Sequence, residues 1–339
     1  MEKMQKYMDF VFFEVWCKAT KNKPYKFHLF NKHKELKSII VKLHYSDSSG
    51  SDLFMRYLEE IYYIFQKFNN GEKAKLKKWY QTTTNIKGLC DNTTKYLPLD
   101  YDKLSDFNYI LSKKIKDLYS LLYGSNPINE LKEFKPYTTT IDEHYKEFMK
   151  INNENICPFC GIHSIKGIYH TKREAYDHFL PKGKYPFNSI NFKNLAPMCH
   201  ECNSSYKLEN NPIFDKQGNR RKAFYPYSLK DTNIDIKVEI DSFSDIKPEN
   251  ITLTITAQEQ EKVDTWIELF GIEERYKAVL SSDSDGKYWL EQFEDELKDI
   301  PIDKIQYLEV KTKQFKKNPY YEKNFLKVAF FEAYITQEE

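Results

Sequence analysis

The chain has 339 residues, a formal net charge of +2 and an aromatic content of 16 %. This length allows two or three domains with a substantial buried core, and so small a net charge does not by itself indicate a nucleic-acid or membrane partner. The apolar stretch Met8–Trp16 contains Asp9 and Glu14 and is far too short to cross a bilayer. Because no signal peptide is visible, we expect a cytoplasmic protein without a membrane partner.

The N-terminal region, 1–150, has the apolar periodicity of helices. The helices expected there are 2–20, 51–68, 102–123 and 141–151. Ser51-Asp52 supplies an N-terminal capping signal for the second of them. The sequence Tyr123-Gly-Ser-Asn-Pro127 predicts a break before the last helix.

The central region, 151–230, loses the helical period and contains cysteines, prolines, asparagines and basic residues instead. Two short extended segments, 174–180 and 192–198, are expected there, followed by a helix that begins near Cys199. Between Cys157 and Lys230 there are 12 Lys and Arg against 5 Asp and Glu. A basic centre suits contact with a polyanion, and a solvated loop is the alternative explanation.

The C-terminal region, 231–339, begins with a predicted β-hairpin. Residues 235–240 and 251–256 alternate between polar and apolar side chains, and Lys247-Pro-Glu-Asn250 turns between them. Helices are then expected at 258–270, 273–281, 288–299, 303–315 and 320–335. The predicted fold class is helix-rich α+β, with the three regions packed into one compact body.

Four of the six cysteines form two Cys-x-x-Cys pairs, Cys157 with Cys160 and Cys199 with Cys202. The two-residue gap lets both thiolates of a turn reach one tetrahedral ion. In a reducing compartment such pairs are typical of metal sites rather than disulfides. Because four thiolates leave no open position on Zn²⁺, we predict a structural zinc site, with an iron–sulfur cluster as the alternative. Cys17 and Cys90 are interpreted as buried core thiols.

The segment between the two cysteine pairs is longer than the roughly 15–20 residues usual in such sites, which indicates an inserted functional element. It contains Asp177-His178, whose side chains would point to opposite faces of a strand unless a bend or bulge intervenes. Cleavage of a phosphodiester needs a base for water and a hard cation for the leaving oxygen. His178 is the candidate base, and Asp177 and Asn203 are candidate oxygen ligands of Mg²⁺ or Mn²⁺.

Asp177-His178, Asn194 and Asn203 together resemble the motif of the ββα-metal HNH endonucleases in their cysteine-rich, zinc-stapled form. The resemblance implies a central zinc-bound ββα-metal unit at 151–230. It implies that His178 is the general base and Asp177 a ligand of the catalytic metal. It also implies that Asn194 orients the loop and the base, and that Asn203 ligates the catalytic metal. Asn203 departs from the family pattern, which has histidine at this position.

Three stretches are further similar to the HNH proteins of bacterial anti-phage systems, including the Septu type: Asp177-His-Phe-Leu-Pro-Lys182, Lys184-Tyr-Pro186 and Asn194-Leu-Ala-Pro-Met-Cys199. In those systems the nuclease acts beside an ATPase. This chain has no phosphate-binding loop of its own, so the resemblance implies a separate ATPase partner subunit.

Several basic residues near the motif are candidates for contacts with a nucleic-acid backbone. They are Lys182, Lys184, Lys207, Arg220 and Arg221. A solvent-facing loop is the alternative for each. The lysine-rich run 73–78 beside Trp79 is interpreted as a solvated helix face, with contact to nucleic acid as its alternative.

These observations predict a metal-dependent endonuclease that hydrolyses phosphodiester bonds in DNA, with RNA left open, as an effector of an anti-phage system. One such site cuts one strand, so cleavage of both strands requires a homodimer or two visits. Two alternatives belong to other classes. The first is a zinc-stapled nucleic-acid-binding module without catalysis, and the second is an adaptor in a defence complex.

Overall fold

The computed structural model describes residues 2–124, 131–152, 154–228, 232–299 and 302–338. It contains two compact units, each assembled from segments that are distant in sequence. The first unit comprises 1–150, 176–197 and 209–227, and the second comprises 151–175, 198–208 and 228–339. The predicted central region, 151–230, therefore contributes segments to both units, and the division into three regions stays a prediction. Of the predicted break at 123–127, the positions 125–127 lie outside the described residues.

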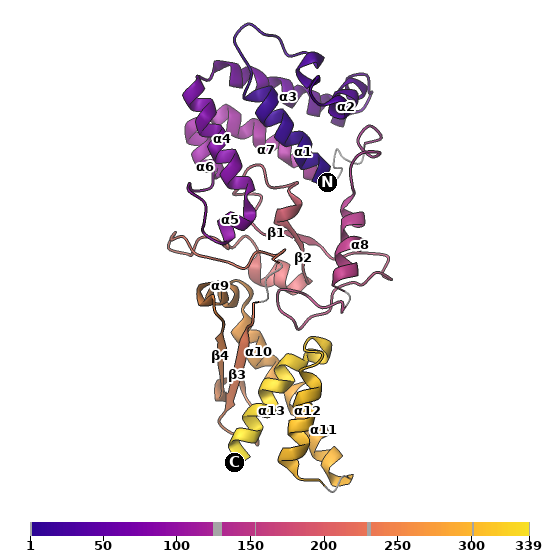
Figure 1. Cartoon of the computed structure of the whole chain (residues 1–339), viewed down its shortest axis with the longest axis vertical. Helices are drawn as coiled ribbons and strands as arrows, with labels where there is room; N and C mark the ends of the chain where they lie inside the picture. Colours follow the sequence, from indigo (N-terminus) through magenta and orange to yellow (C-terminus); the bar gives the residue numbers. More distant parts are fainter. Residues whose placement is uncertain (1, 125–130, 153, 229–231, 300–301, 339) are drawn as a thin grey trace. The chain divides into compact units, whose positions relative to one another are not determined.

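The first unit is largely helical (Figure 1). Its helices are α1 (Glu2–Phe10), η1 (Val11–Trp16), η2 (Phe27–Phe30), α2 (Lys34–His44), α3 (Ser49–Lys67), α4 (Asn70–Thr84), α5 (Ile86–Cys90), α6 (Tyr101–Phe107), α7 (Tyr109–Tyr123) and α8 (Ile141–Ile151). The helices predicted at 2–20, 51–68 and 141–151 are confirmed to within a few residues. The helix predicted at 102–123 is instead two helices, because Asn108 has an extended backbone and its side chain caps α7.

An aromatic core fills the first unit. Phe12 and Tyr80 stack with ring centroids 4.0 Å apart, and the ring of Phe187 lies 4.7 Å from that of Tyr80. Phe187 has a φ angle of 74°, a left-handed conformation that is strained for a bulky side chain. Packing in the core stabilises this conformation, so the loop between the two predicted central strands is anchored among the helices. Cys17 and Cys90 are buried, as predicted.

Two three-residue strands in the first unit carry part of the predicted site. β1 (Tyr176–His178) pairs antiparallel with β2 (Leu195–Pro197), and Asp177 lies opposite Ala196. The register is regular through all three pairs, so of the bend or bulge considered for Asp177-His178, a bulge is not present within β1. The segment predicted as a strand at 192–198 begins instead as a short helix, η4 (Phe192–Asn194), because the Asn191 side chain accepts a hydrogen bond from the backbone N–H of Lys193.

The second unit contains a β-hairpin and helices. Its elements are η5 (Cys202–Lys207), β3 (Asp235–Ile240), η6 (Pro248–Asn250), β4 (Ile251–Thr256), α9 (Gln260–Phe270), α10 (Ile272–Ser281), α11 (Gly286–Asp299), α12 (Lys304–Phe315), η7 (Tyr321–Lys323) and α13 (Asn324–Glu338). The hairpin is confirmed with the predicted strand boundaries. The last helix begins later than predicted, at Asn324, because Glu322 has a left-handed backbone. Figure 1 shows α13 beside the hairpin, which it contacts along β3.

Helices and two two-stranded sheets confirm a helix-rich α+β architecture in the described residues. Among those residues, each helix is either too short or too polar to cross a membrane.

Candidate functional site

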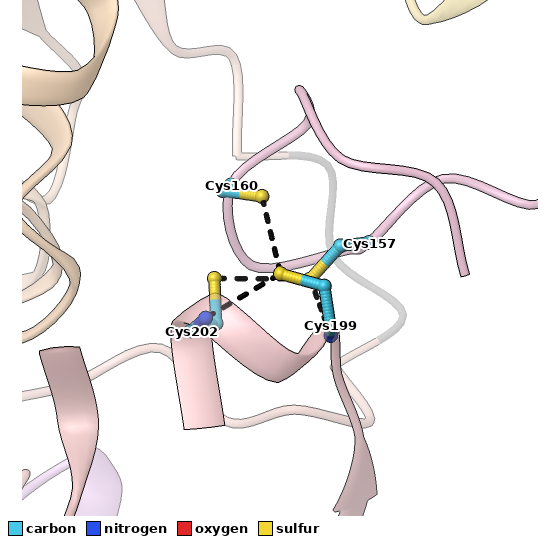
Figure 2. A group of neighbouring side chains, drawn as sticks. All are labelled: Cys157, Cys160, Cys199 and Cys202. Atoms are coloured by element: carbon cyan, nitrogen blue, oxygen red, sulfur yellow. Dashed lines mark hydrogen bonds between the residues drawn. The ribbon is translucent and has the colours of Figure 1, made fainter. Parts of the chain in front are cut away.

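Four cysteine thiols meet in the second unit (Figure 2), where their Sγ atoms all lie within 4.8 Å of one another. The Sγ atoms of Cys157 and Cys202 are 3.9 Å apart, as are those of Cys160 and Cys199. Tetrahedral bonds of about 2.3 Å to Zn²⁺ place neighbouring sulfurs about 3.8 Å apart, whereas a disulfide needs about 2.05 Å. The four thiols are therefore free of disulfides and are placed so that they could bind zinc.

The local backbone supports this cluster. The N–H of Cys199 donates to Cys157 Sγ at 3.3 Å, and the N–H of Cys202 donates to Cys199 Sγ at 3.4 Å. Gly161 closes the first turn by donating its N–H to Cys157 O at 2.9 Å, with a φ angle of 70°. A left-handed residue at this position favours glycine. The sequence Cys-Pro-Phe-Cys-Gly therefore folds into a turn that presents both thiols to one point.

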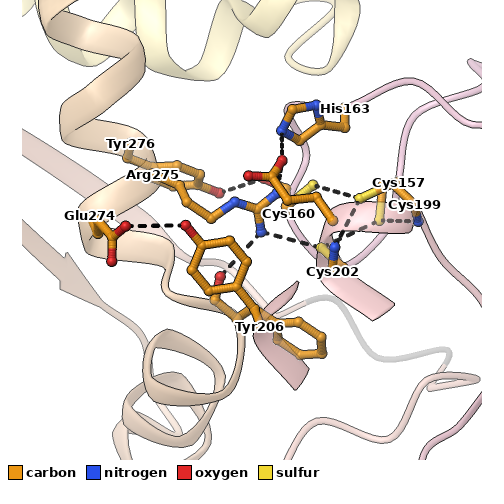
Figure 3. A network of polar contacts seen from close by, with 11 residues as sticks. Cys157, Cys160, His163, Cys199, Cys202, Tyr206, Glu274, Arg275 and Tyr276 are labelled. Atoms are coloured by element: carbon orange, nitrogen blue, oxygen red, sulfur yellow. Dashed lines mark hydrogen bonds and ion pairs between the residues drawn. The ribbon is translucent and has the colours of Figure 1, made fainter. Parts of the chain in front are cut away.

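A buried arginine from α10 contacts the cysteine cluster (Figure 3). Arg275 is 4 % exposed, and its Nη1 donates to Cys202 Sγ at 3.2 Å and to Phe270 O at 3.1 Å. Four thiolates around Zn²⁺ carry a net charge of −2. A guanidinium beside them offsets part of that charge and satisfies a sulfur lone pair. Arg275 is therefore suited to stabilise the loaded metal site without being a ligand.

Further side chains hold this arginine in place. Arg275 Nη2 donates to Glu201 Oε2 at 3.3 Å, and Glu201 also pairs with His163. The ring of Tyr206 lies 4.7 Å from the guanidinium, and its hydroxyl donates to Glu274 at 3.2 Å. In Figure 3, Tyr206 lies beside the guanidinium, and Glu274 lies next to the tyrosine hydroxyl. A guanidinium fixed on several sides keeps its orientation toward the sulfur at little further entropic cost.

The helices beside the cluster also bind the first cysteine turn directly. Tyr276 donates its hydroxyl hydrogen to Cys160 O at 2.9 Å, and Trp266 Nε1 donates to Phe159 O at 2.6 Å. The rings of Phe159 and Phe270 lie 5.1 Å apart. The first cysteine turn is therefore packed against the C-terminal helices α9 and α10 and hydrogen-bonded to them.

Replacing Arg275 by glutamine is expected to lower zinc affinity about 10–100-fold, because the thiolates lose a charged donor while all four ligands remain. Competition with a chromogenic chelator measures this affinity, and circular dichroism checks that the variant is folded. Lys277→Gln is the matched control, because Lys277 lies on the same helix and pairs with Glu273 away from the cysteines. Equal zinc affinities in the two folded variants would contradict a role for Arg275 at the cluster.

Asn194 clamps the loop that joins β1 to β2 in the first unit. This side chain is fully buried; its Oδ1 accepts from Leu180 N at 2.7 Å, and its Nδ2 donates to Leu180 O at 2.9 Å. Phe179 N also donates to Asn194 O at 2.8 Å. An amide is well suited to this position because it offers a donor and an acceptor side by side. The two ends of the loop are therefore held together directly after His178.

His178 is the last residue of β1 and is 8 % exposed. Its Nε2 lies 3.0 Å from Ser189 O, and its ring packs edge-on against Tyr123 with centroids 4.4 Å apart. Ser189 in turn donates its hydroxyl hydrogen to Tyr119 O at 3.0 Å. Asp177 precedes His178 and is 5 % exposed. The helical part of the unit therefore holds the histidine ring in a defined orientation.

Replacing Asn194 by alanine is expected to lower the free energy of unfolding by about 2–4 kcal/mol, because the buried N–H and C=O of Leu180 lose their partner. Urea titration measures this loss through the unfolding midpoint. Lys193→Ala changes an exposed neighbouring side chain and serves as the control. A midpoint for Asn194→Ala that equals that of the control would show that the clamp does not stabilise the loop.

Asn203 and the cysteines belong to the second unit, whereas Asp177, His178 and Asn194 belong to the first. Asn203 lies at the second position of η5 and is half-buried, and its side chain makes no hydrogen bond among the described residues. Its amide oxygen thus remains available for another contact. The structure describes the two halves of the predicted site separately, each with a defined local geometry.

The predicted basic contacts fall into two groups. Lys182 and Lys184 are exposed, and Lys182 Nζ lies 4.6 Å from the centre of the Tyr123 ring that contacts His178. Arg220 donates to Ile213 O and Leu89 O, and Arg221 donates to Asn211 O. Lys207 is fully buried. A backbone phosphate in solvent needs exposed donors, so we keep only Lys182 and Lys184 as candidates for this contact.

Sequence reasoning missed two contacts of the site. Arg275 lies 73 residues after Cys202 and has no motif that separates it from other basic residues. His144 on α8 has its Nδ1 2.6 Å from the hydroxyl of Tyr176, and its ring stacks on Phe192 at 4.1 Å. Arg275 contacts the cysteines and His144 contacts β1 only once the chain has folded.

These features define a helix-rich α+β protein with a four-cysteine cluster that could bind zinc and a short hairpin that carries a buried acid–histidine pair. Comparison with known proteins finds partial relatives. The chain is 36 % identical over 88 residues to protein ea31 of Escherichia phage lambda, a match that covers 26 % of each chain. It is 30 % identical over 96 residues to the Septu protein PtuB of Bacillus thuringiensis, covering 26 % of this chain and 36 % of that protein.

The matched part is therefore about a quarter of the phage protein and about a third of the Septu protein. No family model matches the chain, and no solved structure matches it.

Proposed function

We propose that the chain is a metal-dependent endonuclease of the HNH type that hydrolyses phosphodiester bonds in DNA. The observation that carries this proposal is the buried pair Asp177-His178 on β1, followed by a loop that Asn194 holds at Leu180. In the sequence, this segment lies between the two cysteine pairs of a cluster that could bind zinc. Neither half alone is specific. An acid–histidine pair occurs in many cores, and a cysteine cluster alone indicates only a stapled fold.

The contact of His178 with Ser189 determines which ring nitrogen can act. A neutral imidazole that donates its Nε2 hydrogen to the Ser189 carbonyl has its lone pair on Nδ1. Nδ1 would then accept a proton from an attacking water. The edge-on Tyr123 ring and the carbonyl together prevent rotation of the imidazole, so the base is oriented before substrate binds.

Asp177 and Asn203 would hold the catalytic ion, because carboxylate and amide oxygens are the ligands that Mg²⁺ and Mn²⁺ prefer. When bound, such an ion supplies positive charge that neutralises the oxygen leaving the phosphate. Asp177 precedes the base directly, and Asn203 follows β2 by six residues in the chain. We propose that both reach one ion, as the resemblance to HNH endonucleases implies.

A zinc ion at the four cysteines would stabilise the turns before β1 and after β2, because it joins Cys157 and Cys160 to Cys199 and Cys202. Four thiolates complete its coordination, so it would have no position for substrate. Zinc would therefore stabilise the fold, while the ion at Asp177 would take part in hydrolysis.

The biological setting is part of the proposal. The match to a Septu protein agrees with the resemblance of the motif to HNH proteins of anti-phage systems. We therefore propose a role as the nuclease effector of such a system, with an ATPase as a separate subunit. A homodimer would let two sites cut opposite strands.

A supercoiled plasmid tests the nuclease activity. Zinc-loaded protein with added Mg²⁺ or Mn²⁺ is expected to produce nicked circles before linear DNA, since one site cuts one strand. Asp177→Asn is expected to need a higher metal concentration for the same rate, because an amide binds a divalent cation more weakly than a carboxylate. Asp215→Asn is the control, because Asp215 is a half-buried carboxylate whose hydrogen bonds are within its own turn. Equal metal requirements in the two variants would contradict a ligand role for Asp177.

Asn203 in place of the family histidine supports a second candidate, a binding module without catalysis. That protein would bind DNA with zinc loaded, would leave the plasmid intact at every metal concentration, and would bind equally well with Ala at position 178. Cleavage that depends on His178 would exclude it.

A further inference from the structure

Two lysines from different segments of the first unit converge on one exposed tyrosine. Lys78 lies on α4 and Lys95 follows α5, and their Nζ atoms lie 5.2 and 5.6 Å from the centre of the Tyr96 ring. The pKa of Tyr96 is lowered, first by the hydrogen bond from Lys78 and then by the nearby positive charges. The phenol oxygen and both ammonium groups therefore lie together on the surface.

This cluster has an uncompensated positive charge. Neither Lys78 nor Lys95 forms an ion pair within the part of the chain that the structure describes, whereas many other surface lysines do. The ring attracts each ammonium group while the two like charges repel each other, so an anion bound between them would be stabilised by both charges. Three donors in one place are suited to a phosphate, which has several acceptor oxygens.

The cluster is joined to the loop that carries the proposed site. Asn188 Nδ2 donates to Thr83 O at 2.8 Å, and Asn191 Nδ2 donates to Thr84 O at 3.3 Å. Thr83 is five residues after Lys78 on α4, which is about 7–8 Å along a helix. The hydroxyl of Thr83 also accepts from Leu99 N at 2.8 Å, three residues after Tyr96. Both segments of the cluster therefore meet at the residues that hold the loop.

The segment after Tyr96 also contacts the stretch that contains the exposed lysines of that loop. Tyr101 N donates to the backbone oxygen of Lys184 at 3.0 Å, so the segment after Tyr96 lies along the segment that contains Lys182 and Lys184. Exposed lysines therefore lie on both of the segments that this hydrogen bond joins. A nucleic-acid backbone presents negative charge at regular short intervals.

We propose that Lys78, Lys95 and Tyr96 form a binding site for the phosphate backbone of the nucleic-acid substrate, outside the position of cleavage. This inference rests on the proposed function and extends it, because it gives the N-terminal helical region a part in substrate binding. It also revises the interpretation of the lysine run 73–78, since Lys78 contributes to a site while the rest of the run remains a helix surface. Contacts to phosphates position the substrate without selecting its sequence.

The test uses the full-length, zinc-loaded chain with His178→Ala, so that binding is measured without cleavage. Fluorescence anisotropy of a short labelled DNA duplex, at a series of salt concentrations, compares this protein with one that also carries Lys78→Gln and Lys95→Gln. The matched control carries Lys18→Gln and Lys32→Gln instead. It removes the same charge from the same unit, but both lysines already pair with Glu14, at 2.8 and 3.0 Å.

Loss of two phosphate contacts is expected to weaken binding about tenfold or more at low salt and to reduce the slope of log affinity against log salt by about 2. The control pair should change both quantities much less. Equal affinities and slopes for the two double variants would overturn the inference, as would a folded parent protein that does not bind DNA. Plasmid cleavage by the chain with His178 intact reports on the proposed function separately. Cleavage with unchanged binding in the lysine variant would refute only this site, and weakened binding without cleavage in any protein would refute only the nuclease.

Discussion

Replacing His178 by alanine is expected to slow DNA cleavage about 10²–10⁴-fold, which is the usual contribution of a general base. The loss follows from removal of the nitrogen that would deprotonate water, since the Ser189 carbonyl leaves Nδ1 as the accepting atom. Zinc content and DNA affinity should stay near those of wild type. The rate is measured from single-turnover nicking of a supercoiled plasmid at saturating Mg²⁺ or Mn²⁺.

A second readout separates chemistry from folding. Added imidazole should restore part of the cleavage by His178→Ala, because it can occupy the space of the missing ring and accept the proton. His170→Ala is the matched control, because His170 is an exposed histidine in the same stretch of sequence and has no place in the proposed site. Wild-type rates in folded His178→Ala would refute the assignment of the base.

Removing zinc is expected to have the largest effect on stability. Structural zinc contributes about 10–16 kcal/mol of apparent binding free energy in small zinc-binding peptides, which is comparable with the whole stability of a typical domain. Chelation, or a double change of Cys157 and Cys160 to serine, should therefore unfold the turns around the cluster. Hydrogen exchange should rise sharply at 156–165 and 198–208, and also in α10 because Arg275 and Tyr276 contact the cluster.

The helical core provides an internal reference for that experiment. Residues 54–65 of α3, which pack in the aromatic core of the first unit, should keep their protection from exchange. Cys17→Ser changes another buried thiol and should keep one zinc ion per chain. Unchanged exchange around the cysteines after complete zinc removal would contradict a structural role for the metal.

The cysteine pairs and the C-terminal hairpin could be predicted from the sequence, because each depends on residues that are close together in the chain. The Cys-x-x-Cys spacing places two thiols on one turn whatever surrounds it, and the structure brings both pairs together. The strands 235–240 and 251–256 were predicted to the residue, because their alternation and the turn between them agree.

Predictions failed where a single side chain determines the backbone. The helix expected at 102–123 ends at Phe107 because Asn108 caps the next helix, and asparagine within a helical pattern gives no clear sign of that choice. Of the bend or bulge considered for Asp177-His178, the bulge is not found in β1, where the register is regular. The fixed orientation of His178 comes instead from Ser189 and Tyr123, which contact it from segments outside the strand.

The roles of distant residues could not be predicted at all. Arg275 reaches Cys202 from a helix far along the chain, and Thr83 and Thr84 hold the loop through their backbone carbonyls. Every residue has a backbone carbonyl, so the residue type at positions 83 and 84 does not indicate these contacts. The sequence of the N-terminal region therefore predicted helices but no function. In the structure, this region holds the proposed base and carries the lysine–tyrosine cluster.

Binding of Mn²⁺ to the zinc-loaded chain, followed by loss of the free-ion electron paramagnetic resonance signal, tests most directly whether Asp177 and Asn203 share one catalytic ion. We expect one Mn²⁺ per chain beyond the zinc, bound more weakly by Asp177→Asn and by Asn203→Ala. The double variant should lose less affinity than the sum of the two single losses, because ligands of one ion are coupled. Wild-type Mn²⁺ affinity in folded Asn203→Ala, together with lost binding in Asp177→Asn, would contradict the shared site.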